Sequence, residues 1–222
     1  MSKDPSARPR KRHEEVVRAA AELFYERGYD ATTTRDITER LGLLKGSLYY
    51  YIDTKEDLLF AAMQSALEGG LFSFKVALEG GGSPLDRLGR VIKNHVIFLS
   101  QNLLETTLVL HEARSLTDAR REVILAEEDA YRRGIRELIE AGKAEGLVRP
   151  DVDPQMVTMC VLGAINWVYR WYSESGGTSP EEIGQQFADV LVAGISAPEP
   201  VRRSRGPAKV ADPQRQKRRT SK

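Results

Sequence analysis

The stretch from Thr33 to Asp57 limits the possible folds of this chain more than any other part of its sequence. It reads TTRDITERLGLLKGSLYYYIDTKED, in which two short helical patterns flank a turn at Gly42. Thr33 with Asp36 three residues later resembles a capping box, with Asp in place of the preferred Glu. The order of helix, glycine turn and helix is typical of a helix-turn-helix, whose second helix enters the major groove of DNA.

The same stretch offers both kinds of contact that DNA binding needs. Hydroxyls near helix N-termini and basic side chains suit phosphates, whereas aromatic and basic side chains reach base edges. A glycine lets the backbone approach the DNA closely. We therefore predict DNA contacts at Thr34, Arg35, Lys45, Gly46, Ser47, Tyr49, Tyr50 and Lys55.

The three successive tyrosines cannot all face DNA, and tyrosines on a short helix often pack internally. Leu48 and Ile52 lie four residues apart and are expected to face the core. Tyr49 and Tyr50 are then expected to point outward, and Tyr51 to pack partly against the first helix.

Charge is concentrated at the two ends of the chain. Residues 1–12 hold five Lys or Arg and one acid, and residues 201–222 hold nine Lys or Arg and one acid. Because the whole chain has a net charge of only +1, the part between them is acidic. This distribution suits a protein that contacts nucleic acid at particular points, although both ends can equally be solvated tails.

Composition excludes several other classes of protein. The single cysteine, Cys160, rules out a disulfide framework, and no spacing of zinc ligands is present. There is no long uncharged apolar run and no signal-peptide pattern, so we expect a cytoplasmic protein that does not enter membranes. We predict no metal and no cofactor.

Hydrophobic periodicity predicts an all-α fold of about nine helices. The expected helices span residues 10–27, 34–41, 45–51, 54–79, 84–99, 103–116, 118–145, 154–172 and 180–195. The sequence GG at 69–70 is expected to weaken or bend the fourth of them. We predict a disordered arm (1–9), a DNA-binding domain (10–53), a ligand-binding and dimerisation domain (54–196) and a basic disordered tail (197–222).

The C-terminal half contains apolar helices with a few polar residues, as expected of a small-molecule pocket. Asn166 and Arg170 lie four residues apart in an otherwise apolar helix and should share a face. Arg170 can contact a ligand, or it can pair with an acid such as Glu105 or Glu112. The ligand-binding candidates are Phe98, Leu104, Leu108, His111, Asn166, Trp167, Arg170 and Trp171, with His95 and Leu103 also considered.

Two other classes of protein, an enzyme and a helical adaptor, fit the sequence less well. An enzyme would need a nucleophile–base spacing, a phosphate loop or a metal cluster, and the run Glu127, Glu128, Asp129 is better interpreted as a solvated helix face. A helical adaptor with a vestigial helix-turn-helix would bind no DNA, so the steep salt dependence of a DNA binder would distinguish the two.

The pattern T-T-R-D-I-x-x-x-L-G-x-x-K-G-S-L-Y-x-Y-I-x-x-K-E-D-L-L resembles the DNA-binding segment of the tetracycline-repressor family, over about Val16 to Leu59. Ile52 departs from the family pattern, where an aromatic residue commonly sits. The resemblance implies a homodimeric repressor that binds a palindromic double-stranded operator and a small-molecule effector. It also implies a dimer interface of four helices, for which Val157–Trp171 and Ile183–Ile195 are suited.

The segment from Trp167 to Tyr172, with the glycines and helix that follow it, is similar to a subgroup of that family. Members of this subgroup control fatty-acid or steroid catabolism and respond to acyl-CoA thioesters. The resemblance implies an acyl-CoA-type or other apolar anionic effector. We expect the effector to move the helix that starts near Thr54 and so to release repression, which is the commoner polarity in that family; activation is the alternative. The alternative is a repressor of efflux genes that responds to apolar or cationic compounds.

Overall fold

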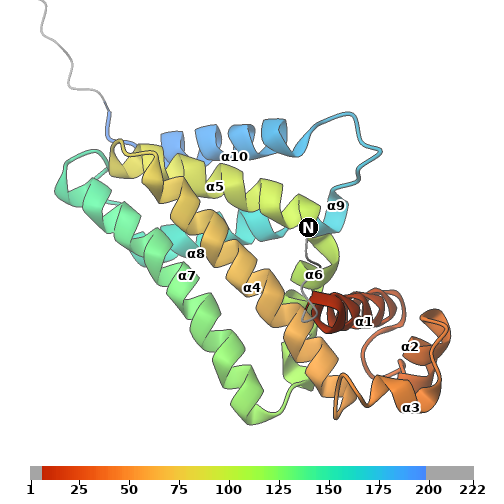
Figure 1. Ribbon diagram of the computed structural model, residues 1–222. Helices are drawn as coiled ribbons and strands as arrows, with labels where there is room; N and C mark the ends of the chain where they lie inside the picture. Colours follow the sequence, from red (N-terminus) through yellow and green to blue (C-terminus); the bar gives the residue numbers. More distant parts are fainter. Residues whose placement is uncertain (1–6, 199–222) are drawn as a thin grey trace, which may run out of the picture.

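The computed structural model describes residues 7–198 (Figure 1). The regular structure of these residues is α-helical, as predicted. A single antiparallel bridge joins Val148 to Ser196. The helices are α1 (Ala7–Arg27), α2 (Thr34–Arg40), α3 (Lys45–Leu48), α4 (Lys55–Glu79), α5 (Pro84–Gln101), α6 (Leu103–Glu112), the 3-10 helix η1 (Ala113–Ser115), α7 (Asp118–Ala144), α8 (Pro154–Asn166), α9 (Val168–Trp171) and α10 (Pro180–Ile195).

Local sequence signals determine where several helices begin. Thr33, Thr54, Ser83 and Ser179 each form a complete capping box with the acid three residues later. In such a box the hydroxyl of the capping residue accepts from the backbone N–H of the residue three positions later. The carboxylate of that later residue accepts from the backbone N–H of the capping residue. The hydrogen bonds from the side chain and backbone of Thr33 lower the pKa of Asp36.

Several predicted boundaries were wrong. Residues 7–9 of the predicted arm already belong to α1, and residues 1–6 lie outside the described part of the chain. The helix predicted over 45–51 ends at Leu48. Residues 199–222 of the predicted tail are also outside the described part, but Ala197 still donates its N–H to the Leu147 carbonyl at 2.7 Å.

The helix predicted over 154–172 is divided into α8 and α9 at Trp167. The N–H groups of Trp167 and Tyr172 donate to carbonyls four residues earlier, whereas the Arg170 N–H donates to the Trp167 carbonyl, three residues earlier, in a tighter turn. Asn166 and Arg170 therefore do not share one continuous helical face.

Helix α4 passes through Gly69 and Gly70 without interruption. The reason for a glycine at position 69 is a close approach from α5. A Cβ atom added to Gly69 would stand 2.8 Å from Cε2 of Phe98, closer than any side chain tolerates. The glycine therefore admits the Phe98 ring against the backbone of α4.

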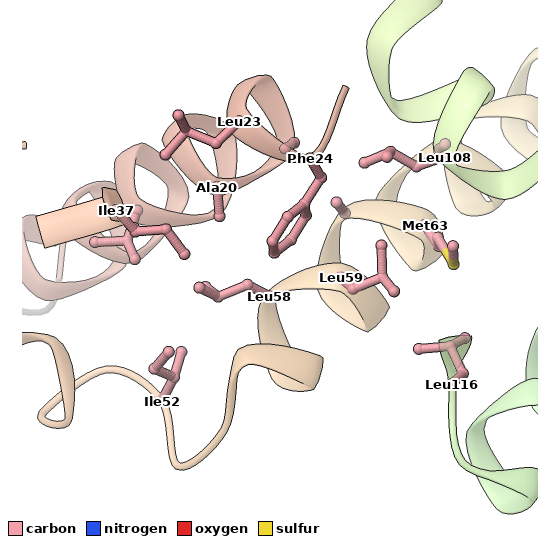
Figure 2. Close-up of a cluster of buried hydrophobic side chains, with 14 of the residues drawn as sticks. Ala20, Leu23, Phe24, Ile37, Ile52, Leu58, Leu59, Met63, Leu108 and Leu116 are labelled. Atoms are coloured by element: carbon pink, nitrogen blue, oxygen red, sulfur yellow. The ribbon is translucent and has the colours of Figure 1, made fainter. Parts of the chain in front are cut away.

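The buried side chains form two apolar clusters. The first unites α1, α2 and α3 with the start of α4 and with Leu108 and Leu116 (Figure 2). In Figure 2 the ring of Phe24 points from α1 toward Leu58 and Leu59 of α4. The second cluster joins α5, α7, α8, α9 and α10. The first cluster thus packs the N-terminal helices directly onto α4 and α6.

Helix α4 connects the two ends of the molecule. It runs from the N-terminal helices α1–α3 along the diagonal of the view to the region of α5 and α7 (Figure 1). Within residues 7–198, no helix is both long and apolar enough to cross a membrane.

Candidate DNA interface and ligand cavity

The helix-turn-helix is built as the sequence predicts. Ile37 and Leu48 are fully buried and fix α2 and α3 on the first cluster. Gly42 has φ +63°, in the left-handed region that favours glycine, and this conformation turns the chain between the two helices. The N–H of Leu43 donates to the Thr38 carbonyl at 2.8 Å and closes the turn.

The tyrosines have the unequal surroundings that were predicted. Tyr49 and Tyr50 are 51% and 78% exposed, whereas Tyr51 packs partly against the first cluster. The rings of Tyr50 and Tyr51 meet edge to face, with centroids 5.2 Å apart. The outer face of the motif therefore presents two aromatic side chains to solvent.

The other predicted DNA contacts, except Lys55, lie on α2 and α3. Arg35 is exposed and pairs with Glu39 on the same helix at 2.7 Å, Thr34 and Ser47 are half-buried, and Gly46 has open space where a Cβ would be. The backbone of Lys45 opens α3, but its side chain lies outside the described part of the structure.

The structure gives Lys55 a role different from the predicted phosphate contact. Its Nζ donates to the carbonyls of Tyr29 and Thr32 at 2.7 and 2.9 Å and lies 4.0 Å from the centre of the Tyr29 ring. The ammonium therefore ties the α1–α2 loop to the first turn of α4. We leave Lys55 out of the proposed DNA contacts.

The next two residues of α4 bind α7. Both the N–H and the hydroxyl of Thr117 donate to one carboxylate oxygen of Glu56 at 2.8 Å, so that Glu56 caps the start of α7. Arg120 of α7 hydrogen bonds to Asp57 and lies 3.6 Å from Glu56. Although burial opposes it, the hydrogen bonds from Arg120 and from the Thr54 and Asp53 backbone lower the pKa of Asp57. We call Lys55, Glu56 and Asp57 the α4 junction.

A cavity of about 130 Å³ lies between the two apolar clusters. Its wall comes from α4, α5, α6, α7 and α8, and is mainly apolar. The lining residues are Ala66, Leu67, Gly70, Leu71, His95, Phe98, Leu99, Thr106, Val109, Leu110, Glu127, Glu128, Tyr131, Arg132, Leu162 and Asn166. Since ligand pockets usually hold about 300–1,000 Å³, a large ligand must open this cavity or extend out of it.

A buried hydrogen-bonded chain crosses one side of the cavity. His95 lies 2.8 Å from the Tyr131 hydroxyl through Nδ1 and 3.0 Å from Asn166 Oδ1 through Nε2. Burial lowers the pKa of His95 to about 4, against the opposing hydrogen bond to Asn166, and burial also raises the pKa of Tyr131. The imidazole is therefore neutral, accepts from Tyr131 and donates to Asn166.

Of the predicted ligand contacts, Phe98 and Asn166 line this cavity, together with His95. Leu108 is buried in the first cluster, with Leu104 packed against that cluster. Four other candidates are exposed: His111 on α6, and Trp167, Arg170 and Trp171 at and after the turn that ends α8. His111 lies 2.8 Å from the Tyr169 hydroxyl.

The expectation of a solvated face at Glu127 and Glu128 was wrong, because both residues line the cavity. Burial and the charge of Glu68 raise the pKa of Glu127, and burial raises that of Glu128 against the opposing charge of Arg132. Only the tertiary arrangement reveals this, because residues of α4 and α6 line the same cavity. No group of three metal-ligating side chains occurs within residues 7–198.

A third surface carries exposed apolar side chains on α8, α9 and α10. We call this set the outer apolar face: Met156, Met159, Trp167, Trp171 and Val190. Met156 and Met159 lie three residues apart on α8 and so share one helical face. Exposed apolar residues in such a group usually mark a contact with another protein.

Together, a helix-turn-helix with an open outer face and a helical domain enclosing a cavity define a one-component DNA-binding regulator. Residues 16–62 match the family described as bacterial regulatory proteins, tetR family. Residues 81–195 match the tetracyclin repressor-like C-terminal domain. The chain therefore belongs to the tetracycline-repressor family of transcriptional regulators, as its sequence pattern indicated.

Individual relatives agree with this assignment. The transcriptional repressor KstR2 of Mycolicibacterium smegmatis is 28% identical over 198 residues, which cover 88% of this chain and 96% of that protein. The structure of the ketosteroid transcriptional regulator KstR2 of Mycobacterium tuberculosis is similar with a TM-score of 0.79 and 26% identity, covering 84% of this chain and 96% of that one. The structure of AibR in complex with isovaleryl coenzyme A and operator DNA is similar with a TM-score of 0.72 and 28% identity. The match covers 83% of this chain and 97% of the AibR chain.

Proposed function

We propose that this protein is a homodimeric repressor that releases its operator when an acyl-CoA-type effector enters the cavity, and that it controls genes of lipid or steroid catabolism. The observation that carries the proposal is that α4 both lines the cavity and holds the helix-turn-helix. Leu67, Gly70 and Leu71 line the cavity. Leu58, Leu59 and Met63 of the same helix belong to the first cluster.

The effector class is supported by the relatives. AibR is described in complex with isovaleryl coenzyme A, and KstR2 as a ketosteroid regulator. The apolar cavity suits the acyl part of such a thioester, whereas its small volume requires the coenzyme A part to remain outside.

The proposed coupling runs through the α4 junction. Phe98 borders the cavity and its ring touches α4 at Gly69, so a ligand that displaces the ring changes the packing of α4. A shift of α4 would move Lys55 and with it the α1–α2 loop that positions the helix-turn-helix. A ligand changes DNA affinity only if it binds one arrangement better than the other.

The proposed dimer forms through the outer apolar face. The two helix-turn-helix motifs of such a dimer would read two half-sites, whose spacing depends on the relative orientation of the protomers. Burial of Met159, Trp171 and Val190 against a second copy would remove exposed apolar surface from water.

The test is a gel-shift titration of the full-length protein on the DNA upstream of its own gene, with and without a panel of acyl-CoA thioesters. We expect sequence-specific binding that falls steeply with salt, and release by at least one thioester. DNA binding that no thioester changes would contradict the effector class. Release by apolar amines instead would favour a repressor of efflux genes.

A further inference from the structure

The cavity contains polar atoms whose hydrogen-bonding capacity is not used. Among the described residues, three buried side-chain polar atoms have no hydrogen-bond partner, and two of them line the cavity. These are Oγ1 of Thr106, from α6, and Oε2 of Glu127, from α7. Because buried polar atoms in folded proteins nearly always have a partner, this pair indicates a partner that enters from outside.

The surroundings of Glu127 determine which partner fits. The neighbouring acids are Glu128 on the same helix and Glu68 on α4, and the one lining cation, Arg132, hydrogen bonds to Asp129 at 3.1 Å. Burial and Glu68 raise the pKa of Glu127, so its carboxyl is easier to protonate than an exposed one. A neutral carboxyl can donate its O–H, as the Thr106 hydroxyl can.

The chain of His95, Tyr131 and Asn166 adds no charge to the cavity. The imidazole of His95 uses both ring nitrogens, toward Tyr131 and Asn166. Asn166 accepts from His95 through its oxygen, and its N–H groups make no hydrogen bond within residues 7–198. The polar groups facing the cavity therefore include hydrogen-bond donors, with no unpaired cation among the lining residues.

We propose that the cavity binds an uncharged, mostly apolar group carrying a ketone, alcohol or thioester oxygen, and that Thr106 and Glu127 hydrogen bond to that oxygen. The inference deepens the proposed function, since it takes the cavity to be the effector site. For a thioester effector, it places the acyl part inside and the charged coenzyme A part outside.

Charged ligand groups fit less well. A carboxylate in the cavity would face Glu127 and Glu128 and would lose its hydration, while the lining cation, Arg132, already hydrogen bonds to Asp129. An ammonium group would also lose its hydration, and the burial that raises the pKa of Glu127 disfavours the carboxylate that would pair with it. The rest of the wall is mainly apolar.

The test uses four probes with one six-membered ring and different polar groups: cyclohexanone, cyclohexanol, cyclohexanecarboxylate and cyclohexylamine. Their dissociation constants for the full-length protein are measured by ligand-observed NMR. We expect the ketone and the alcohol to bind at least tenfold more tightly than the carboxylate and the amine. Equal or tighter binding of either charged probe, or no binding of the neutral pair up to their solubility, would overturn the proposal.

Substitutions at Thr106 and Glu127 test whether these two residues bind the probe. Thr106→Val and Glu127→Leu should each weaken cyclohexanone binding about tenfold, because each removes one hydrogen-bonding group of similar size. Glu127→Gln, which stays uncharged and keeps a donor, should bind within about threefold of the wild type. Glu122→Gln, an exposed position on the same helix, is the matched control and should change nothing.

Operator binding of every variant is measured in parallel. Wild-type probe affinity in both Thr106→Val and Glu127→Leu would overturn the assigned residues, whereas Glu122→Gln should keep the probe affinity and the operator affinity of the wild type. Failure of the wild type to bind any operator would instead contradict the proposed function, whatever the probes do.

Discussion

At the scale of single residues, Tyr50 and Tyr51 are adjacent in the chain but have different surroundings. Tyr50→Ala should weaken operator binding about tenfold and leave the free energy of unfolding nearly unchanged, because the side chain is 78% exposed. Tyr51→Ala should reduce that free energy by about 2 kcal/mol, since Tyr51 packs on the first cluster. Fluorescence anisotropy and urea unfolding measure the two effects. A greater loss of stability in the Tyr50 variant would contradict the assignment.

The buried His95 predicts a pH dependence of stability. Its folded-state pKa is about 4, below the ordinary histidine value of 6.5, so the unfolded chain binds the additional proton first as pH falls. The stabilising contribution is therefore present above pH 6.5 and is lost as pH falls from 6.5 to 4, by about 3 kcal/mol. Urea unfolding of the wild type and of His95→Gln at several pH values isolates this contribution. The same pH dependence in both proteins would refute it.

At the scale of elements, the α4 junction is expected to transmit the effect of the ligand. Arg120→Met removes the hydrogen bond to Asp57 and the ion pair with Glu56. We expect this variant to bind operator and effector separately with little change, while the effector-induced loss of operator affinity shrinks at least fivefold. Arg121→Met is the matched control, because Arg121 pairs with Asp118 on its own helix. Unchanged coupling in the Arg120 variant would exclude the junction as the route.

The paired glycines of α4 offer a second test at this scale. Gly69→Ala would place a methyl group 2.8 Å from the Phe98 ring, whereas the nearest atom to a new Cβ at Gly70 is 3.8 Å away. We expect Gly70→Ala to stabilise the protein by about 0.5–1 kcal/mol through helix propensity. Gly69→Ala should destabilise it. Thermal unfolding measures both, and a stabilising Gly69→Ala would mean that the Phe98 contact is easily displaced.

What the sequence could reveal at this scale depends on how local the cause is. The helix starts at Thr54 and Ser83 were predictable, because a capping box lies within four consecutive residues. The role of Lys55 was not, since its two carbonyl partners belong to the α1–α2 loop. The position of Glu127 was misjudged for the same reason: a run of acids indicates a solvated surface until α4 and α6 cover it.

At the scale of the whole molecule, the outer apolar face should determine the oligomeric state. Val190→Glu should convert a dimer to a monomer in sedimentation experiments and weaken operator binding at least tenfold, because it places a charge in the proposed interface. Val123→Glu is the matched control, since Val123 is 41% exposed on α7, away from that face, whereas Val190 is 71% exposed. A dimeric Val190 variant would contradict the proposed interface.

The central claim is that the cavity and the DNA-binding face are two sites linked through α4. Linkage requires that the effector weaken operator binding by the same factor as the operator weakens effector binding. The direct test measures the affinity for an acyl-CoA thioester with the protein free and saturated with operator, and the operator affinity with and without the thioester. We predict two equal factors of about ten or more. Thioester binding that is equally tight in the free and operator-bound protein would contradict the account.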